Sequence, residues 1–356
     1  MRPRIILRTH YQANEPRAIV AAAIDCASPT ESRQEDAVAA ALVKWAEENG
    51  QTLSLPGAVY AVGNAKSLGL LNTSQRWTAT GLAFGYVQSV LAVPKGVEGL
   101  PLTRPERRLY LKCYLEHGGA LVVKFGQWLL NHGHATDDQL RDESIIEHLL
   151  VQALDEYLAI ATDVRDRAAI RRERERLARL EYKSLTKRHK RYPLLRTMER
   201  LQLIVCVDDN RHQRVISPDP AGRLAATLKV IPDIPTLERL CRDDALSTAL
   251  TEALGGFSNN GAPQGRPVAS HIVDSYRFAI QRGLQACPLQ YLDDVLFAFH
   301  MASGGLVTAE PILERLRRRY PHEVRFHVNR RGRRAFVLIG SGLELDLERL
   351  LDHPAA

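Results

Sequence analysis

The chain has 356 residues, of which 45% are hydrophobic, and a formal net charge of +7 at neutral pH. It is long enough for two or three domains, and the excess of positive charge favours an acidic partner. The five cysteines form no C-x-x-C pair, which argues against a disulfide framework or a zinc ribbon and indicates a reducing compartment. The sequence has neither an apolar run of roughly 18 residues nor a secretory signal, so we expect a cytoplasmic chain.

Residues 1–93 are expected to form a first small domain. The apolar residues of Asp36–Glu48 recur at helical spacing, and Pro56–Leu71 follows as a second helix. A short turn and another helix complete the segment. Only Lys66 and Arg76 add positive charge near the second helix. We therefore expect this domain to contact protein as readily as DNA.

A second domain is expected over residues 102–225, after a connector at Pro94–Pro101 that is rich in Pro and Gly. Thr103 and Glu106 have the spacing of a capping box, which predicts the start of a helix. We expect this helix to end at Gly118-Gly119. An apolar helix follows it.

One long helix is predicted over Asp137–Arg179, because neither Pro nor Gly interrupts this stretch. Residues 165–200 hold fourteen Arg or Lys against five Asp or Glu, an excess of nine. In the helix itself, Glu173 and Glu175 alternate with arginines. An exposed helix stabilised by its own ion pairs is therefore the alternative to nucleic-acid contact there.

The basic stretch continues at residues 187–191, where the cations have no acidic neighbours. Tyr192–Leu201 is predicted to be a helix with two arginines on one face, and a hairpin-like stretch, Leu203–Ile216, follows. The candidate nucleic-acid-binding residues of this region are Lys187, Arg188, Lys190, Arg191, Arg196 and Arg200.

The third expected domain, residues 226–356, contains a flexible loop at 255–267 and then two helices. A basic helix, Thr308–Tyr320, leads into a hairpin whose turn is Asn329–Arg334. Arginine binds phosphate with two hydrogen bonds and also pairs with guanine. The alternative is that these are solvated surface charges. The candidate residues are Arg317, Arg318, Arg330, Arg331, Arg333 and Arg334.

The hairpin is expected to bury its apolar residues and to present its arginines at the turn. The residues expected to pack inward are Val324, Phe326, Val328, Phe336 and Leu338.

A helix followed by a short hairpin thus occurs three times, a pattern that resembles the winged-helix superfamily over about half of the chain. The expected fold is mainly α with short β-hairpins, as tandem winged-helix-like domains joined by a long basic helix. The resemblance implies a non-catalytic partner of duplex DNA, associated with the nucleoid. It would be a regulator or a subunit of a DNA-processing complex from a mobile element or a defence locus. The alternative is a scaffold whose winged helices bind a protein partner or a second copy of the chain.

Enzymatic readings have weaker support in the sequence. The phosphate-binding motif G-x-x-x-x-G-K-[ST] is absent, as are G-x-S-x-G and H-E-x-x-H. A metal-dependent nuclease would have to combine Asp163 or Asp166 with Glu181 and Lys183. His132 and His134 would need further ligands to hold a metal. We expect no catalytic residue, cofactor, metal, membrane or small-molecule substrate.

Overall fold

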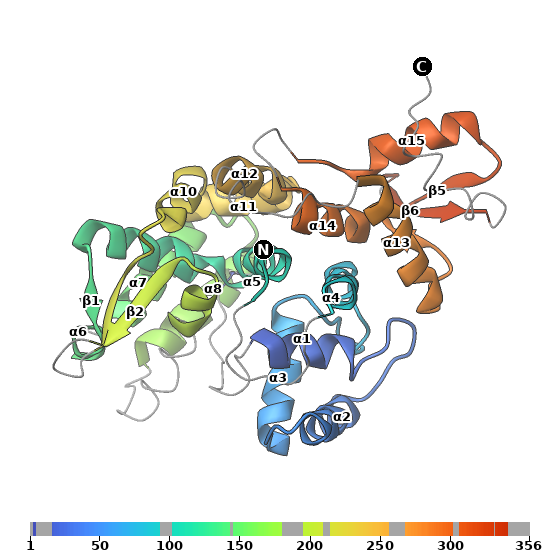
Figure 1. Cartoon of the computed structure of the whole chain (residues 1–356). Coiled ribbons are helices and arrows are strands. Elements are labelled where there is room, and N and C mark those ends of the chain that lie inside the picture. The colour runs from blue at the N-terminus through green and yellow to red at the C-terminus, as the bar shows by residue number, and fades with distance from the viewer. Residues whose placement is uncertain are drawn as a thin grey trace. The chain divides into compact units, whose positions relative to one another are not determined.

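The computed structural model describes residues 3–4, 16–92, 102–142, 145–179, 195–208, 214–255, 268–301, 306–330 and 332–340. The chain is mainly helical and contains two small three-stranded antiparallel sheets (Figure 1). The expected class, mainly α with short β-hairpins, is therefore confirmed. The connector 94–101 and nearly all of the loop 255–267 lie outside the described residues.

None of the helices in these described ranges is both long and apolar enough to cross a lipid bilayer.

The chain divides into two compact units that are not consecutive in sequence. The central unit contains Met1–Ile19 and Tyr110–Phe257, and the flanking unit contains Val20–Leu109 and Ser258–Ala356. Residues 20–109 and 258–356, which are far apart in the sequence, thus belong to one unit. The expected division into three consecutive domains stays a prediction.

Four helices form the N-terminal part of the flanking unit, and polar caps fix where two of them begin. Ser54 accepts a hydrogen bond from the backbone N–H of Gly57 (3.3 Å), and Thr78 accepts one from that of Gly81 (3.1 Å). The helices are α1 (Pro16–Ile24), α2 (Glu35–Glu48), α3 (Leu55–Ser67) and α4 (Ala79–Val90). The predicted second helix is therefore shorter than expected.

The C-terminal part of the flanking unit has a three-stranded sheet with the strand order β4-β6-β5. Its α14 packs against α4, and the hydroxyl of Thr80 on α4 donates to Asp294 Oδ2 of α14 at 2.8 Å. Both side chains are buried. The elements are α13 (Val268–Gln281), β4 (Cys287–Pro288), α14 (Leu289–His300), α15 (Ala309–Arg319), β5 (Val324–Val328) and β6 (Arg334–Ile339).

The central unit has a second three-stranded sheet, with the order β1-β3-β2. Its long helix α5 (Arg104–His132) begins in the flanking unit. Residues 195–200 are also helical. The other elements are β1 (Ala135–Thr136), α6 (Asp137–Asp142), α7 (Ile145–Ile160), α8 (Val164–Arg179), β2 (Ile204–Asp208), β3 (Arg214–Pro218), α10 (Arg223–Val230), α11 (Ile234–Arg242) and α12 (Leu246–Leu254).

The predicted end of a helix at Gly118-Gly119 is wrong, because α5 continues to His132. A glycine inside a helix costs only about 1 kcal/mol relative to alanine, and here it permits close packing. A Cβ on Gly119 would lie 2.9 Å from Leu237 Cδ2, and one on Gly126 would lie 2.9 Å from Leu228 Cδ1. Both glycines thus let α10 and α11 approach α5. The predicted capping box is confirmed, since Glu106 Oε2 accepts from the backbone N–H (2.8 Å) and hydroxyl (2.7 Å) of Thr103.

The single long helix predicted over Asp137–Arg179 is also wrong, because α6, α7 and α8 are separate helices. The Asp163 carboxylate accepts from the backbone N–H groups of Arg165 (2.7 Å) and Asp166 (3.1 Å) and so begins α8. α8 packs against α7, and Arg174 binds Asp155 of α7 through two hydrogen bonds (2.6 and 3.3 Å). The basic helix is therefore one arm of a helical pair.

One order of elements recurs three times: a helix, a short strand, one or more helices, and then two strands. The last strand in sequence is the central strand of the sheet. The C-terminal part of the flanking unit shows it in full. The N-terminal part shows it with single β-bridges, Ser28 to Arg76 and Leu71 to Trp77, in place of strands. The central unit shows it with α7 and α8 inserted. Each copy therefore places a helix directly before a pair of extended segments.

Candidate nucleic-acid interface

α15 is fixed by contacts at its start and along its buried face. The Asp293 carboxylate of α14 accepts the backbone N–H of Ala309 at 2.7 Å and caps the helix. Leu313 and Leu316 are buried, which turns the opposite face outward. Arg315, Arg318 and Arg319 are exposed, and two of these lie in the last turn, where positive charge is favoured by the helix dipole.

The hairpin after α15 is closed by Asn329. Its backbone N–H donates to the carbonyl of Arg333 (2.8 Å), and its side-chain oxygen accepts the backbone N–H of Arg333 (3.1 Å). Arg330 and Arg333 are exposed at this turn. Arg331 lies outside the described residues. The hairpin predicted from the sequence is thus confirmed.

The prediction of which hairpin residues pack inward is partly wrong. Val324 is buried as expected, but Val328 and Phe336 are 62% and 41% exposed. In β6 the buried residues are Val337 and Ile339. A register shift between His327 and Val328 precedes the turn, so the alternation in one strand does not continue in phase into the other.

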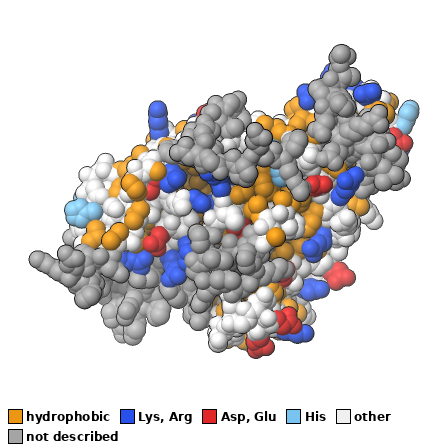
Figure 2. Space-filling view, in the orientation of Figure 1, with side chains coloured by type: hydrophobic (Ala, Val, Ile, Leu, Met, Phe, Trp, Pro, Cys, Tyr) orange, Lys and Arg blue, Asp and Glu red, His pale blue; other side chains and the backbone are white. Residues whose placement is uncertain are grey.

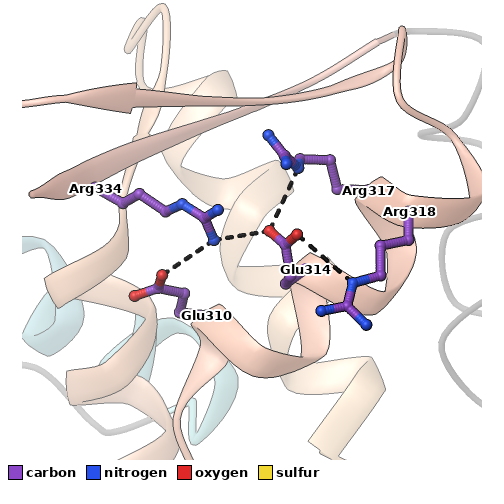
Figure 3. A network of polar contacts seen from close by, with 5 residues as sticks. All are labelled: Glu310, Glu314, Arg317, Arg318 and Arg334. Atoms are coloured by element: carbon purple, nitrogen blue, oxygen red, sulfur yellow. Dashed lines mark hydrogen bonds and ion pairs between the residues drawn. The ribbon is translucent and has the colours of Figure 1, made fainter.

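Two glutamates of α15 bind three of the candidate arginines (Figure 3). Glu314 Oε2 is 2.7 Å from Arg334 Nη1 and 3.3 Å from Arg317 Nε, and its Oε1 is 3.8 Å from Arg318 Nε. Glu310 Oε1 is 3.2 Å from Arg334 Nη1. We call these five residues the α15 ion-pair network. It joins the first residue of β6 to α15.

Arg334 therefore does not behave as an exposed residue of the hairpin turn, as the sequence led us to expect. Its guanidinium lies 4.6 Å from the ring centre of Phe326, and that of Arg317 lies 6.0 Å from the same ring. Arg315, which we did not select from the sequence, lies with Arg318 on the wall of an open hollow of about 470 Å³. The signal that could have identified Arg315 is its position on the helix face opposite the buried Leu313 and Leu316.

The candidate residues of the central unit are only partly described. Leu195, Met198 and Leu201 are buried, while Arg196 and Arg200 are half-buried on the other side of this helical turn. The amphipathic pattern predicted for this helix is confirmed at these positions. Four further candidates, Lys187, Arg188, Lys190 and Arg191, lie outside the described residues.

Two of the residues considered for enzymatic chemistry, Asp163 and His132, make other contacts. Asp163 caps α8. Glu181 and Lys183 lie outside the described residues. His132 stacks on Trp128 with 4.3 Å between ring centres, and its Nδ1 lies 2.8 Å from the carbonyl oxygen of Trp128. The described part of the chain contains no group of three or more His, Cys, Asp or Glu side chains that could hold a metal ion.

On the face shown in Figure 2, basic, acidic and apolar side chains of the described residues are intermixed. On this face the described residues form no broad basic patch. No protein-family model matches the chain, and no curated protein or solved structure is significantly similar to it.

Proposed function

We propose that the chain binds duplex DNA without catalysing a reaction on it, and that α15 with the β5–β6 hairpin makes the main contact. The observation that carries this proposal is the exposure of arginines on both elements. They are Arg315, Arg318 and Arg319 on α15 with Arg330 and Arg333 at the turn. The chain would act as a regulator or as a subunit of a DNA-processing complex.

The chemistry of these arginines suits the groove and the backbone of DNA. A helix fits the major groove, where arginine pairs with the O6 and N7 atoms of guanine. Arg315 and Arg318 are three positions apart, so they project from neighbouring points on one face of α15. The hairpin turn would reach the flanking phosphates. Most of the affinity would come from these phosphate contacts.

The recurring order of elements supports the winged-helix reading of each copy. A helix that directly precedes two paired extended segments is the arrangement on which the resemblance rests. We propose that all three copies are winged-helix-like, and that the C-terminal copy has the most suitable surface for DNA. In this view the chain is a tandem array in which copies differ in their partners.

A protein-interaction role is the second candidate for the N-terminal copy. Its α3 exposes Leu55 by 53% and Tyr60 by 48%, while Lys66 of the same helix is paired with Glu35 at 2.5 Å. Exposed apolar side chains beside a neutralised cation suit a protein surface better than phosphate. This copy would attach the DNA-binding chain to its assembly.

The test is the salt dependence of binding to a 30-base-pair duplex, measured by fluorescence anisotropy. With six or more phosphate contacts, affinity should fall about 10³-fold or more between 50 and 200 mM salt. Changing Arg315→Gln and Arg330→Gln together should reduce the slope of log affinity against log salt by about two units.

The matched control changes Arg171→Gln and Arg172→Gln, two exposed arginines of α8, and removes the same charge. It should leave the slope nearly unchanged. Absence of binding by the parent at 50 mM salt would contradict the proposed function. Equal slopes for the two variants would contradict the assignment to α15 and the hairpin.

A further inference from the structure

Glu314 lies at the centre of the α15 ion-pair network, among the arginines that the proposed function would use. Its side chain is 19% exposed, whereas that of Arg318 is 79% exposed. It contacts two arginines of its own helix and one from β6 (Figure 3). One carboxylate thus restrains cations from both elements of the candidate interface.

The glutamates of this network lower the positive charge that DNA would meet. Three guanidinium groups carry a charge of +3, and the carboxylates of Glu310 and Glu314 reduce it to +1. A phosphate that contacts Arg317 or Arg318 competes with Glu314 for these guanidinium groups. It also approaches a negative charge, which repels it. Both effects weaken contacts that depend on phosphate alone.

We propose that Glu314 is a specificity-determining residue, which limits sequence-independent binding by holding the network arginines away from phosphate. This inference rests on the proposed function of α15. Non-specific binding comes almost entirely from phosphate contacts, so an opposing charge reduces it more than it reduces contacts to base edges. Specificity is a difference between two affinities, and a repulsive group increases that difference.

The same residue positions the hairpin. Arg334 is bound by both glutamates and lies over Phe326, so the start of β6 is held against α15. With Glu314 changed to Gln, Arg334 keeps Glu310 as a partner. Arg317 and Arg318 lose their ion pairs with Glu314 and become available to phosphate. A glutamine side chain has nearly the same shape, so the change tests charge rather than packing.

The experiment measures binding of a 30-base-pair duplex of random sequence by the parent and by Glu314→Gln. The variant should bind more tightly at 50 mM salt. Its salt slope should be steeper by about one to two units, which adds a roughly four- to sixteenfold loss of affinity between 50 and 200 mM salt. Glu252→Gln is the control, because Glu252 is an exposed residue of α12 and its loss changes the net charge equally.

A second variant keeps the inference testable if Glu314→Gln alters the hairpin. Arg318→Gln should reduce the slope of the parent by clearly less than one unit, because Glu314 restrains this arginine. In the Glu314→Gln background it should reduce the slope by about one unit. Equal effects of Arg318→Gln in both backgrounds would contradict the inference.

The outcomes separate this inference from the proposed function. If the parent binds the duplex and Glu314→Gln has the slope of the Glu252→Gln control, the inference fails and the proposed function stands. If neither the parent nor Glu314→Gln binds at 50 mM salt, both fail. Tighter binding with a steeper slope in Glu314→Gln alone supports both.

Discussion

Helices α3 and α15 occupy equivalent places in two copies of the same order of elements, yet they expose different surfaces. α3 presents Leu55 and Tyr60 to solvent, and its Lys66 is paired with Glu35. α15 presents Arg315 and Arg318. The position of a helix before two extended segments therefore does not determine which side chains it exposes. Under the proposed function, these side chains direct one copy to protein and the other to DNA.

The largest expected effect is on duplex affinity, when arginines of α15 and the hairpin are changed in one protein and exposed apolar residues of α3 in another. Changing Arg315→Gln, Arg330→Gln and Arg333→Gln together removes up to three phosphate contacts and should lower duplex affinity roughly 10²-fold at 100 mM salt. Leu55→Ser with Tyr60→Ser should leave that affinity unchanged, because no charge is altered. A comparable loss in the second variant would remove the distinction between α3 and α15.

The two copies are joined by a buried hydrogen bond, and breaking it should destabilise the flanking unit. Thr80→Val removes the donor to Asp294, which is 1% exposed. We expect the free energy of unfolding to fall by about 1–3 kcal/mol, measured by urea denaturation. Thr251→Val is the control, since its hydroxyl bonds only the Ser247 carbonyl one turn earlier in α12 (2.8 Å). An equal loss of unfolding free energy in the two variants would show that the hydrogen bond between the copies stabilises the unit no more than one within a single helix does.

A smaller effect should separate arginines that position the hairpin from those that face DNA. Arg334 contacts Glu310, Glu314 and Phe326, whereas Arg330 is exposed at the turn. Arg334→Gln should lower stability by about 1 kcal/mol, and Arg330→Gln by less than about 0.5 kcal/mol. Thermal unfolding of both variants gives the comparison. Equal melting temperatures would place Arg334 with the exposed arginines.

The smallest effect is a pH dependence in the flanking unit. Burial and the nearby Arg108 lower the pKa of His300 below its usual 6.5. Below pH 6.5 the unfolded chain therefore binds a proton that the folded chain resists, so stability is complete above this pH and falls as the pH decreases. The melting temperature of the parent should decrease more between pH 7 and 5.5 than that of His300→Gln. An identical decrease in both proteins would exclude His300 as the cause.

The sequence predicted the elements that depend on local signals. The capping box of Thr103 and Glu106, the amphipathic turn at Leu195–Leu201 and the β5–β6 hairpin all depend on neighbouring residues, and all are confirmed. Of the predictions that failed, the long helix Asp137–Arg179 overlooked a local signal, the Asp163 cap of α8, and the helix end at Gly118-Gly119 depended on distant partners. Gly119 does not end α5, because Leu237 of α11 packs on it.

The candidate interface shows the same division between local and distant information. Arginines on a helix and at a turn are visible in the sequence. Their neutralisation is not, because Arg334 meets Glu310 and Glu314 from positions 24 and 20 residues away. Which hairpin residues face inward also depended on a register shift at His327 and Val328 that no spacing rule predicts.

The most direct test of the contrast between the two helices is photo-crosslinking to a bound duplex. A photoreactive amino acid is placed at Arg319 on α15 in one protein and at Tyr60 on α3 in another, both at exposed positions. We predict crosslinks to DNA from position 319 and none from position 60. Crosslinks from position 60 alone, or in equal yield from both, would contradict the assignment of DNA contact to α15.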